Sequence, residues 1–121
     1  MAEYNIKKIL EVIFYAELSG NEPVREWLKE LKVEDRKKIG NDIMVVEYNW
    51  PVGMPLVKPL TKGLREVRTT LDNRIARVIF LIKNKNMVLL HGFIKKTEQT
   101  PIQDLRLAEK RASLFLNKRK R

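Results

Sequence analysis

The chain has 121 residues, 44% of them hydrophobic and 33% charged, with a net charge of +10, no cysteine and one histidine. This composition predicts a single soluble globular domain spanning residues 1–121, and it excludes disulfides, thiolate nucleophiles, cysteine-bound metals and multi-histidine metal centres. The N-terminus carries an early acid, and no stretch approaches the length of a membrane span. We therefore expect neither a signal peptide nor a membrane anchor, and a cytoplasmic protein.

The first half of the chain predicts one strand and two helices. The apolar, β-branched run from Ile6 to Ala16 predicts a strand. Glu22-Pro23 opens a helix, because proline is well tolerated in a first helical turn, and apolar residues follow at helical spacing up to Leu31. A second helix is expected from Glu34 to Tyr48, and the proline-rich segment 50–55 ends it.

The second half predicts three strands and a final helix. The strands are expected at Leu64–Thr70, Arg74–Lys83 and Met87–Lys95, joined by short turns rich in Asp and Asn. Such short connections favour an antiparallel meander. Thr100-Pro101-Ile102-Gln103 has the pattern of a capping box with proline at the first helical position. The predicted element order is β-α-α-β-β-β-α.

Positive charge is concentrated in the predicted strands. Residues 1–57 hold 8 Lys and Arg against 10 acids, whereas residues 58–96 hold 10 Lys and Arg against Glu66 and Asp72 alone. Cations on strands stand in rows and form a shaped surface, which suits a polyanion such as nucleic acid. The basic end, residues 118–121, is expected to be a frayed tail that adds a modest electrostatic attraction.

Strand alternation predicts where these cations meet. Glu66 and Arg68 share one face of the first meander strand, and Arg77 shares a face with the apolar residues of the second. In the third strand, alternation places five residues on one face: Met87, Leu89, His91, Phe93 and Lys95. Paired neighbours would then bring Arg68, Arg77 and Lys95 together around Glu66. The alternative is that these are ordinary solvated charges on an outer face.

Such a cluster suits RNA cleavage by attack of a 2′-hydroxyl on its own phosphate. Fixed Lys and Arg donors stabilise the extra negative charge of the transition state. The reaction also needs a base and an acid, for which Glu66, His91 or a lysine with a lowered pKa are candidates. Surrounding cations would weaken Glu66 as a base. His91 lies in an apolar strand, where a histidine is more often a hydrogen-bonded structural residue.

Several sequence blocks of the second half carry a resemblance to a known family. They are PLVKPL at 55–60, GLREVR at 63–68, RVIF at 77–80, LLHGFIKKT at 89–97 and TP at 100–101. With GNEPV at 20–24 and the amphipathic helix after it, they resemble the phage-derived Gp49-like (HigB-type) toxins of the RelE superfamily. The resemblance covers nearly the whole chain in the same element order.

The resemblance implies a compact α+β fold, RelE-like, with an antiparallel sheet packed against two N-terminal helices and a C-terminal helix. It also implies a toxin of a type II toxin–antitoxin pair. Such toxins enter the ribosomal A site and cut mRNA, and a co-encoded antitoxin, usually a helix-turn-helix protein, holds them inactive. No small-molecule cofactor or metal is expected.

The resemblance also suggests site residues. Arg68 matches the basic residue of the first meander strand, and Arg77 matches the arginine of a Tyr-Arg-hydrophobic motif in which this chain has Ala76. Lys95 and Lys96 match a basic pair after the last strand. Lys58 matches a Lys-x-Leu motif before the sheet. Some members carry a tyrosine near the start of the last helix, and this chain has none after Tyr48.

Three interpretations follow. In the leading one, the protein is a ribosome-dependent, metal-independent mRNA endonuclease. Its catalytic candidates are Glu66, Arg68, Arg77, His91, Lys95 and Lys96, and its RNA-backbone candidates are Lys58, Arg65 and Arg74. In the second, it is a non-catalytic RNA- or ribosome-binding module. A small DNA-binding regulator ranks last, because no helix-turn-helix with an exposed basic recognition helix is evident.

Overall fold

A computed structural model describes the backbone of residues 7–119 and the side chains of residues 7–117. The expected basic tail at 118–121 lies outside the described side chains. The elements are, in chain order, β1 (Glu11–Phe14), α1 (Pro23–Glu30), α2 (Val33–Asn49), β2 (Val57–Pro59), the 3-10 turn η1 (Thr61–Gly63), β3 (Arg65–Leu71), β4 (Arg74–Lys83), β5 (Asn86–Lys95) and α3 (Ile102–Arg119). None of the helices in this described part is long and apolar enough to cross a bilayer.

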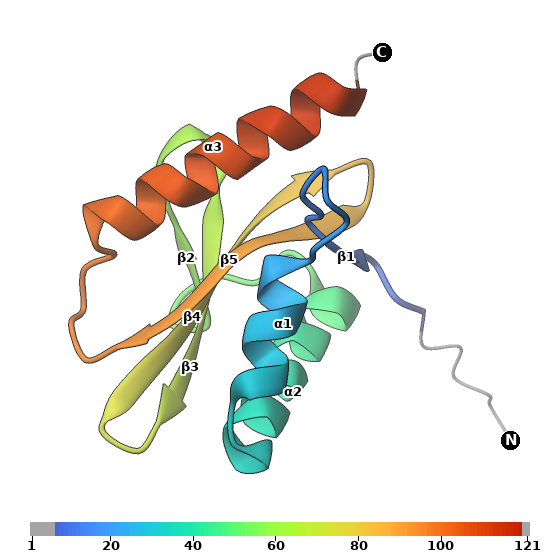
Figure 1. Ribbon diagram of the computed structural model, residues 1–121. Coiled ribbons are helices and arrows are strands. Elements are labelled where there is room, and N and C mark those ends of the chain that lie inside the picture. The colour runs from blue at the N-terminus through green and yellow to red at the C-terminus, as the bar shows by residue number, and fades with distance from the viewer. Residues whose placement is uncertain (1–6, 120–121) are drawn as a thin grey trace, which may run out of the picture.

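The strands form one five-stranded sheet in the order β1-β5-β4-β3-β2 (Figure 1). The meander of β3, β4 and β5 is antiparallel, as predicted. The first strand departs from the antiparallel pattern, because β1 pairs with β5 in parallel. Strand β2 was not predicted. It has three residues, too few for an alternating pattern to show, and it ends in a proline.

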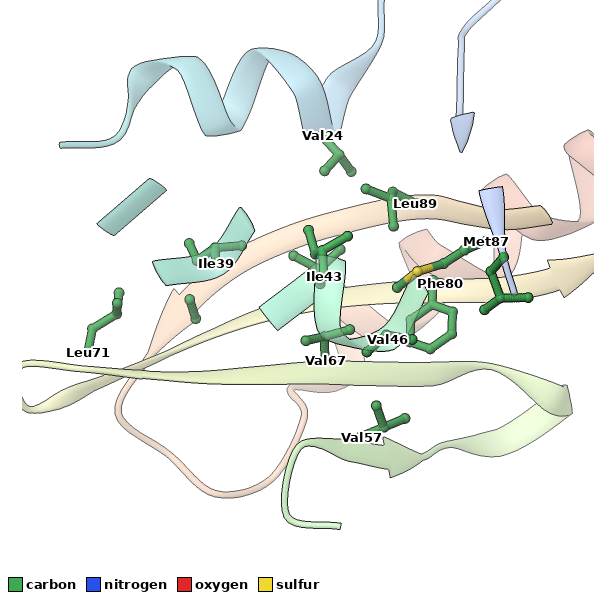
Figure 2. Close-up of a cluster of buried hydrophobic side chains, with 13 residues drawn as sticks. Val24, Ile39, Ile43, Val46, Val57, Val67, Leu71, Phe80, Met87 and Leu89 are labelled. Atoms are coloured by element: carbon green, nitrogen blue, oxygen red, sulfur yellow. The ribbon is translucent and has the colours of Figure 1, made fainter. Parts of the chain in front are cut away.

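Helices cover both faces of the sheet. Helices α1 and α2 pack on one face, and α3 crosses the other (Figure 1). Figure 2 shows the first core, where Ile39, Ile43 and Val46 of α2 meet Val67 and Phe80 of the sheet. The second core lies under α3 and includes Ile79, Leu81, Val88, Leu90, Ala108 and Ala112. The fold is therefore α+β, as expected, and each fully buried aliphatic side chain contributes about 1.5–3 kcal/mol.

An irregularity in β5 changes which residues share a face. Ile79 pairs with His91 but the next residue of β4, Phe80, pairs with Leu89, so Leu90 is an extra residue in β5. Met87 and Leu89 consequently lie in the core under α1 and α2, whereas Phe93 lies in the core under α3. The prediction that residues 87 to 95 show a single alternating face was wrong, because one extra residue reverses the alternation.

Candidate functional site

Two arginines meet around one carboxylate on the α3 face of the sheet. Arg68 of β3 lies directly opposite Arg77 of β4, and Glu66 is two residues before Arg68. Arg68 Nε donates to Glu66 Oε1 at 2.9 Å, and Arg77 Nε lies 4.0 Å from the same oxygen. Glu66 and Arg77 are both completely buried, at 0% exposure. We call Arg68 and Arg77 the arginine pair.

The segment after β5, residues 96–101, closes over the arginine pair, and we call it the covering segment. Arg77 Nη1 donates to the Gln99 main-chain carbonyl at 2.9 Å. Arg68 donates to both the carboxylate and the main-chain carbonyl of Glu98. Thr100 Oγ1 donates to Glu66 Oε2 at 2.8 Å. Three successive residues of the covering segment therefore contact the buried cluster.

Thr100 was predicted to cap the start of the last helix, as the first residue of a capping box. Helix α3 instead begins at Ile102, one residue later than proposed, and the Leu105 N–H bonds to the Pro101 carbonyl. The Thr100 hydroxyl donates to Glu66. Thr100 thus links the covering segment to the sheet.

Arg77 is incompletely satisfied in this position. Its Nε and Nη2 atoms are buried and have no hydrogen-bond partner among the described residues. Its guanidinium lies 5.7 Å from the centroid of the Phe93 ring. Burial lowers the pKa of Arg77 from its ordinary value, and the charge of Glu66 opposes that shift. A buried donor without a partner costs about 1–3 kcal/mol, and more when it is charged.

Glu66 is poorly placed to act as a base. Its two carboxylate oxygens each accept a hydrogen bond, one from Arg68 and one from Thr100, and the side chain is buried. Both oxygens are therefore engaged by donors of the protein, and burial separates them from a substrate. The geometry favours Glu66 as the counter-charge that positions the arginine pair.

A second polar group lies on the same face, at the junction of β5 and α3. His91 Nε2 lies 2.6 Å from Asp104 Oδ1, and Lys95 Nζ lies 3.7 Å from Asp104 Oδ2. The His91 ring stacks on Phe93 with centroids 5.5 Å apart. Burial lowers the pKa of His91 from its ordinary value, and the hydrogen bond to Asp104 opposes the shift. Phe93 thus contacts both His91 and Arg77.

Asp104 was not among the residues chosen from the sequence. It lies in the first turn of α3, where an acidic residue has an ordinary structural reason to occur. Its distance from His91 along the chain hides the contact. One feature of the sequence could have indicated Asp104. It is an acid in the first turn of α3, soon after the basic pair Lys95-Lys96, and α3 packs on the site.

The remaining candidates are divided between the two faces. Lys58 of β2 lies opposite Glu66, so the pairing places it on the face of the arginine pair. Arg65 instead lies 5.0 Å from the ring centroid of Trp50, and Arg74 forms a 3.1 Å ion pair with Asp35 of α2. The structure therefore does not bring Arg65 and Arg74 to the cluster. Lys95 is half-exposed and Lys96 is exposed.

The described residues contain no group of three or more His, Cys, Asp or Glu side chains placed to hold a metal ion.

Among known families, the one described as "Phage derived protein Gp49-like (DUF891)" matches residues 26–113. That family is associated with RelE/HigB-like toxins. The matched range contains the arginine pair, Glu66, His91, Asp104 and the whole covering segment. No curated protein in the comparison matches the chain.

Proposed function

The chain belongs to the phage-derived Gp49-like protein family, and from this premise we propose that it is the toxin of a type II toxin–antitoxin system that cuts mRNA on the ribosome. It acts in the cytoplasm and is neutralised by a cognate antitoxin, which in this group is a helix-turn-helix protein. The observation that carries the proposal is the meeting of Arg68 and Arg77 on the sheet face that also presents His91 and Lys95. Two arginines that share one buried carboxylate leave an excess of positive charge for a phosphodiester.

The proposed reaction is attack of a ribose 2′ oxygen on the adjacent phosphorus. The bond from phosphorus to the 5′ oxygen of the next nucleotide breaks, and the products are a 2′,3′-cyclic phosphate and a 5′-hydroxyl. A base takes the 2′ proton and an acid returns one to the departing 5′ oxygen. Arg77, Lys95 and Lys96 neutralise the phosphorane, while Arg68 and Lys58 hold the RNA backbone.

His91 suits the role of the base. A 2.6 Å contact with the Asp104 carboxylate requires a proton on His91 Nε2. In the neutral ring, Nδ1 then carries the lone pair that can accept a proton. Because burial lowers the pKa of His91 below its ordinary value of 6.5, the ring is neutral near pH 7. Asp104 holds the ring in this tautomer and also contacts Lys95.

Expression in a bacterial host followed by mapping of mRNA 5′ ends tests the proposal. The wild-type chain should produce new cuts that follow the codon phase. Lys95→Ala should reduce cleavage by about 100-fold, which is typical of removing one donor to a transition-state oxygen. Lys95 is 48% exposed, so the variant should fold.

Lys83→Ala is the matched control. This substitution also removes one exposed positive charge. Lys83 pairs with Asn86 at the end of β4, whereas Lys95 pairs with Ile75 near the start of β4. Cleavage by the control should equal wild type. Full activity of Lys95→Ala would make the site assignment wrong. Growth arrest without any new 5′ ends would favour the non-catalytic RNA- or ribosome-binding module.

A further inference from the structure

We propose that the covering segment, residues 96–101, occupies in the free protein the place that RNA phosphates take on the arginine pair, and that it opens when RNA binds. This inference deepens the proposed function, on which it rests for the identity of the ligand. The site is thus an anion site that is closed by the chain's own acceptor groups.

The covering segment makes Arg77 inaccessible. Arg77 has 0% exposure, so no phosphate reaches it while the covering segment stays in place. Among the described residues, the guanidinium of Arg77 makes one hydrogen bond, to the Gln99 carbonyl, and its Nε and Nη2 atoms lack a partner. A phosphate presents several oxygens and full negative charge, so it satisfies a guanidinium better than one carbonyl does.

The covering segment presents oxygen acceptors to the arginine pair. Arg68 contacts the carboxylate and the carbonyl of Glu98, and Arg77 contacts the carbonyl of the next residue, Gln99. A run of oxygen acceptors, one of them negatively charged, thus lies along two neighbouring guanidinium groups. A sugar–phosphate backbone presents acceptors in the same manner.

The covering segment is irregular and exposed, and it lies between firmly held ends. Its residues belong to no helix or strand, and Lys96 to Gln99 are exposed. The Glu98 side chain is 81% exposed, so its ion pair with Arg68 is weak and screened by salt. On either side, Lys95 belongs to β5, and α3 is held to β5 by the contact of Asp104 with His91.

Chemical modification without any ligand tests the opening. Phenylglyoxal modifies accessible arginines, and peptide mass spectrometry assigns the rate to each one. In the wild-type protein, Arg77 should react much more slowly than Arg106, whose side chain is 70% exposed. Thr100→Val removes the hydrogen bond to Glu66 and should speed modification of Arg77 at least about fivefold. Thr100→Ser keeps the hydroxyl and should match wild type.

Binding of an uncleavable RNA provides the second measurement. A single-stranded 2′-O-methyl oligoribonucleotide should bind Glu98→Gln several-fold more tightly than it binds Glu30→Gln. Both substitutions remove one exposed negative charge, but Glu30 lies at the end of α1. Bound oligonucleotide should protect Arg77 of either variant from phenylglyoxal. Since Glu98 is exposed, its variant leaves both cores intact.

The outcomes separate the two proposals. Equal RNA affinity of the two charge variants, or an Arg77 rate unchanged by Thr100→Val, would overturn the covering-segment proposal even if mRNA is cleaved in cells. Faster modification and tighter binding without any cleavage would support the anion site and reject the endonuclease.

Discussion

Glu66 and Arg77 illustrate how burial changes the meaning of charged residues. Both are completely buried, and with Arg68 they form a group of two cations and one anion. Removing one member of a buried pair is costly because it leaves an uncompensated charge. The side chain that the sequence suggested as a base is thus better placed as the counter-charge that keeps two arginines side by side.

His91 makes the stability of the protein depend on pH. Burial lowers the pKa of His91 from 6.5, so the unfolded chain binds this proton more readily than the folded one. The contribution of His91 to stability is therefore full above pH 6.5 and is lost as the pH falls below it. We expect His91→Gln to reduce the loss of unfolding free energy between about pH 7.5 and about pH 5.5.

Urea denaturation of both proteins at the two pH values measures the difference. Glutamine can still donate to Asp104, so the variant removes the titration and keeps the hydrogen bond. An equal loss in the variant would mean that the Asp104 bond balances burial, and a steeper loss would mean that this bond outweighs burial and raises the pKa of His91.

At the residue level, the sequence predicted which charged residues share a face of the sheet. It did not predict the residues of the covering segment that bond to them. Alternation in two regular strands is enough to put Glu66, Arg68 and Arg77 on one face. The contacts with Glu98, Gln99 and Thr100 arise in an irregular segment without periodicity, so no pattern in the sequence announces them. Arg65 and Arg74, which were proposed to contact the RNA backbone, lie away from the arginine pair, beside Trp50 and Asp35.

Among the elements, β5 and α1 are fitted together at one glycine. A Cβ built on Gly92 would lie 2.4 Å from two ring atoms of Trp27, closer than such atoms approach in proteins. Helix α1 therefore packs directly on the backbone of β5. We expect Gly92→Ala to destabilise the fold by about 1–3 kcal/mol, the usual cost of overpacking. Urea denaturation measures it, and the smaller Trp27→Leu side chain should recover part of the loss in the double variant.

Gly40→Ala is the matched control for that substitution. Gly40 lies inside α2, is exposed, and has open space where a Cβ would be. Alanine is the better helix former by about 1 kcal/mol, so this variant should be more stable than wild type. If both alanine variants changed stability in the same direction, close packing at Gly92 would not be the cause.

The elements could be predicted wherever a periodic pattern is long. Helices α1 and α2 and strands β3, β4 and β5 appeared within one or two residues of their expected bounds. Ile6, where the first strand was expected to begin, lies outside the described residues, and within residues 7–16 the strand covers Glu11–Phe14. Its parallel pairing with β5 could not be inferred, because partner and direction are chosen by tertiary packing and not by the residues of a short strand.

On the scale of the whole molecule, charge and structure divide in the same way. Residues 1–57, which include α1 and α2, carry a small excess of acids, whereas residues 58–121, which include most of the sheet and α3, hold 17 of the 25 basic residues. We therefore expect a polyanion to be attracted to one side of the sheet more than to the other. The distribution of charge along the sequence predicts this attraction, while the fold determines which of the cations can take part.

Salt dependence of RNA binding measures which cations take part. For single-stranded RNA, each neutralised phosphate contributes about 0.7 to the slope of log affinity against log salt. Lys95→Ala should lower the slope by about this amount, because Lys95 lies beside the arginine pair's face. Lys83→Ala should leave it unchanged. Equal slopes for both variants would indicate that RNA attaches to the molecule without using this face.

The extra residue at Leu90 determines where β5 can change its length. It acts as a phase shift: before it, odd positions of β5 belong to the core under α1 and α2, and after it they belong to the opposite face. Arg111 donates to the Leu90 carbonyl at 2.8 Å, so helix α3 anchors this phase shift. Deletion of Leu90 itself would restore a regular ladder and keep His91, Phe93 and Lys95 on the face that α3 covers. An insertion or deletion elsewhere in β5 would instead turn part of the strand over, so the cost of a change in length depends on where in the strand it falls.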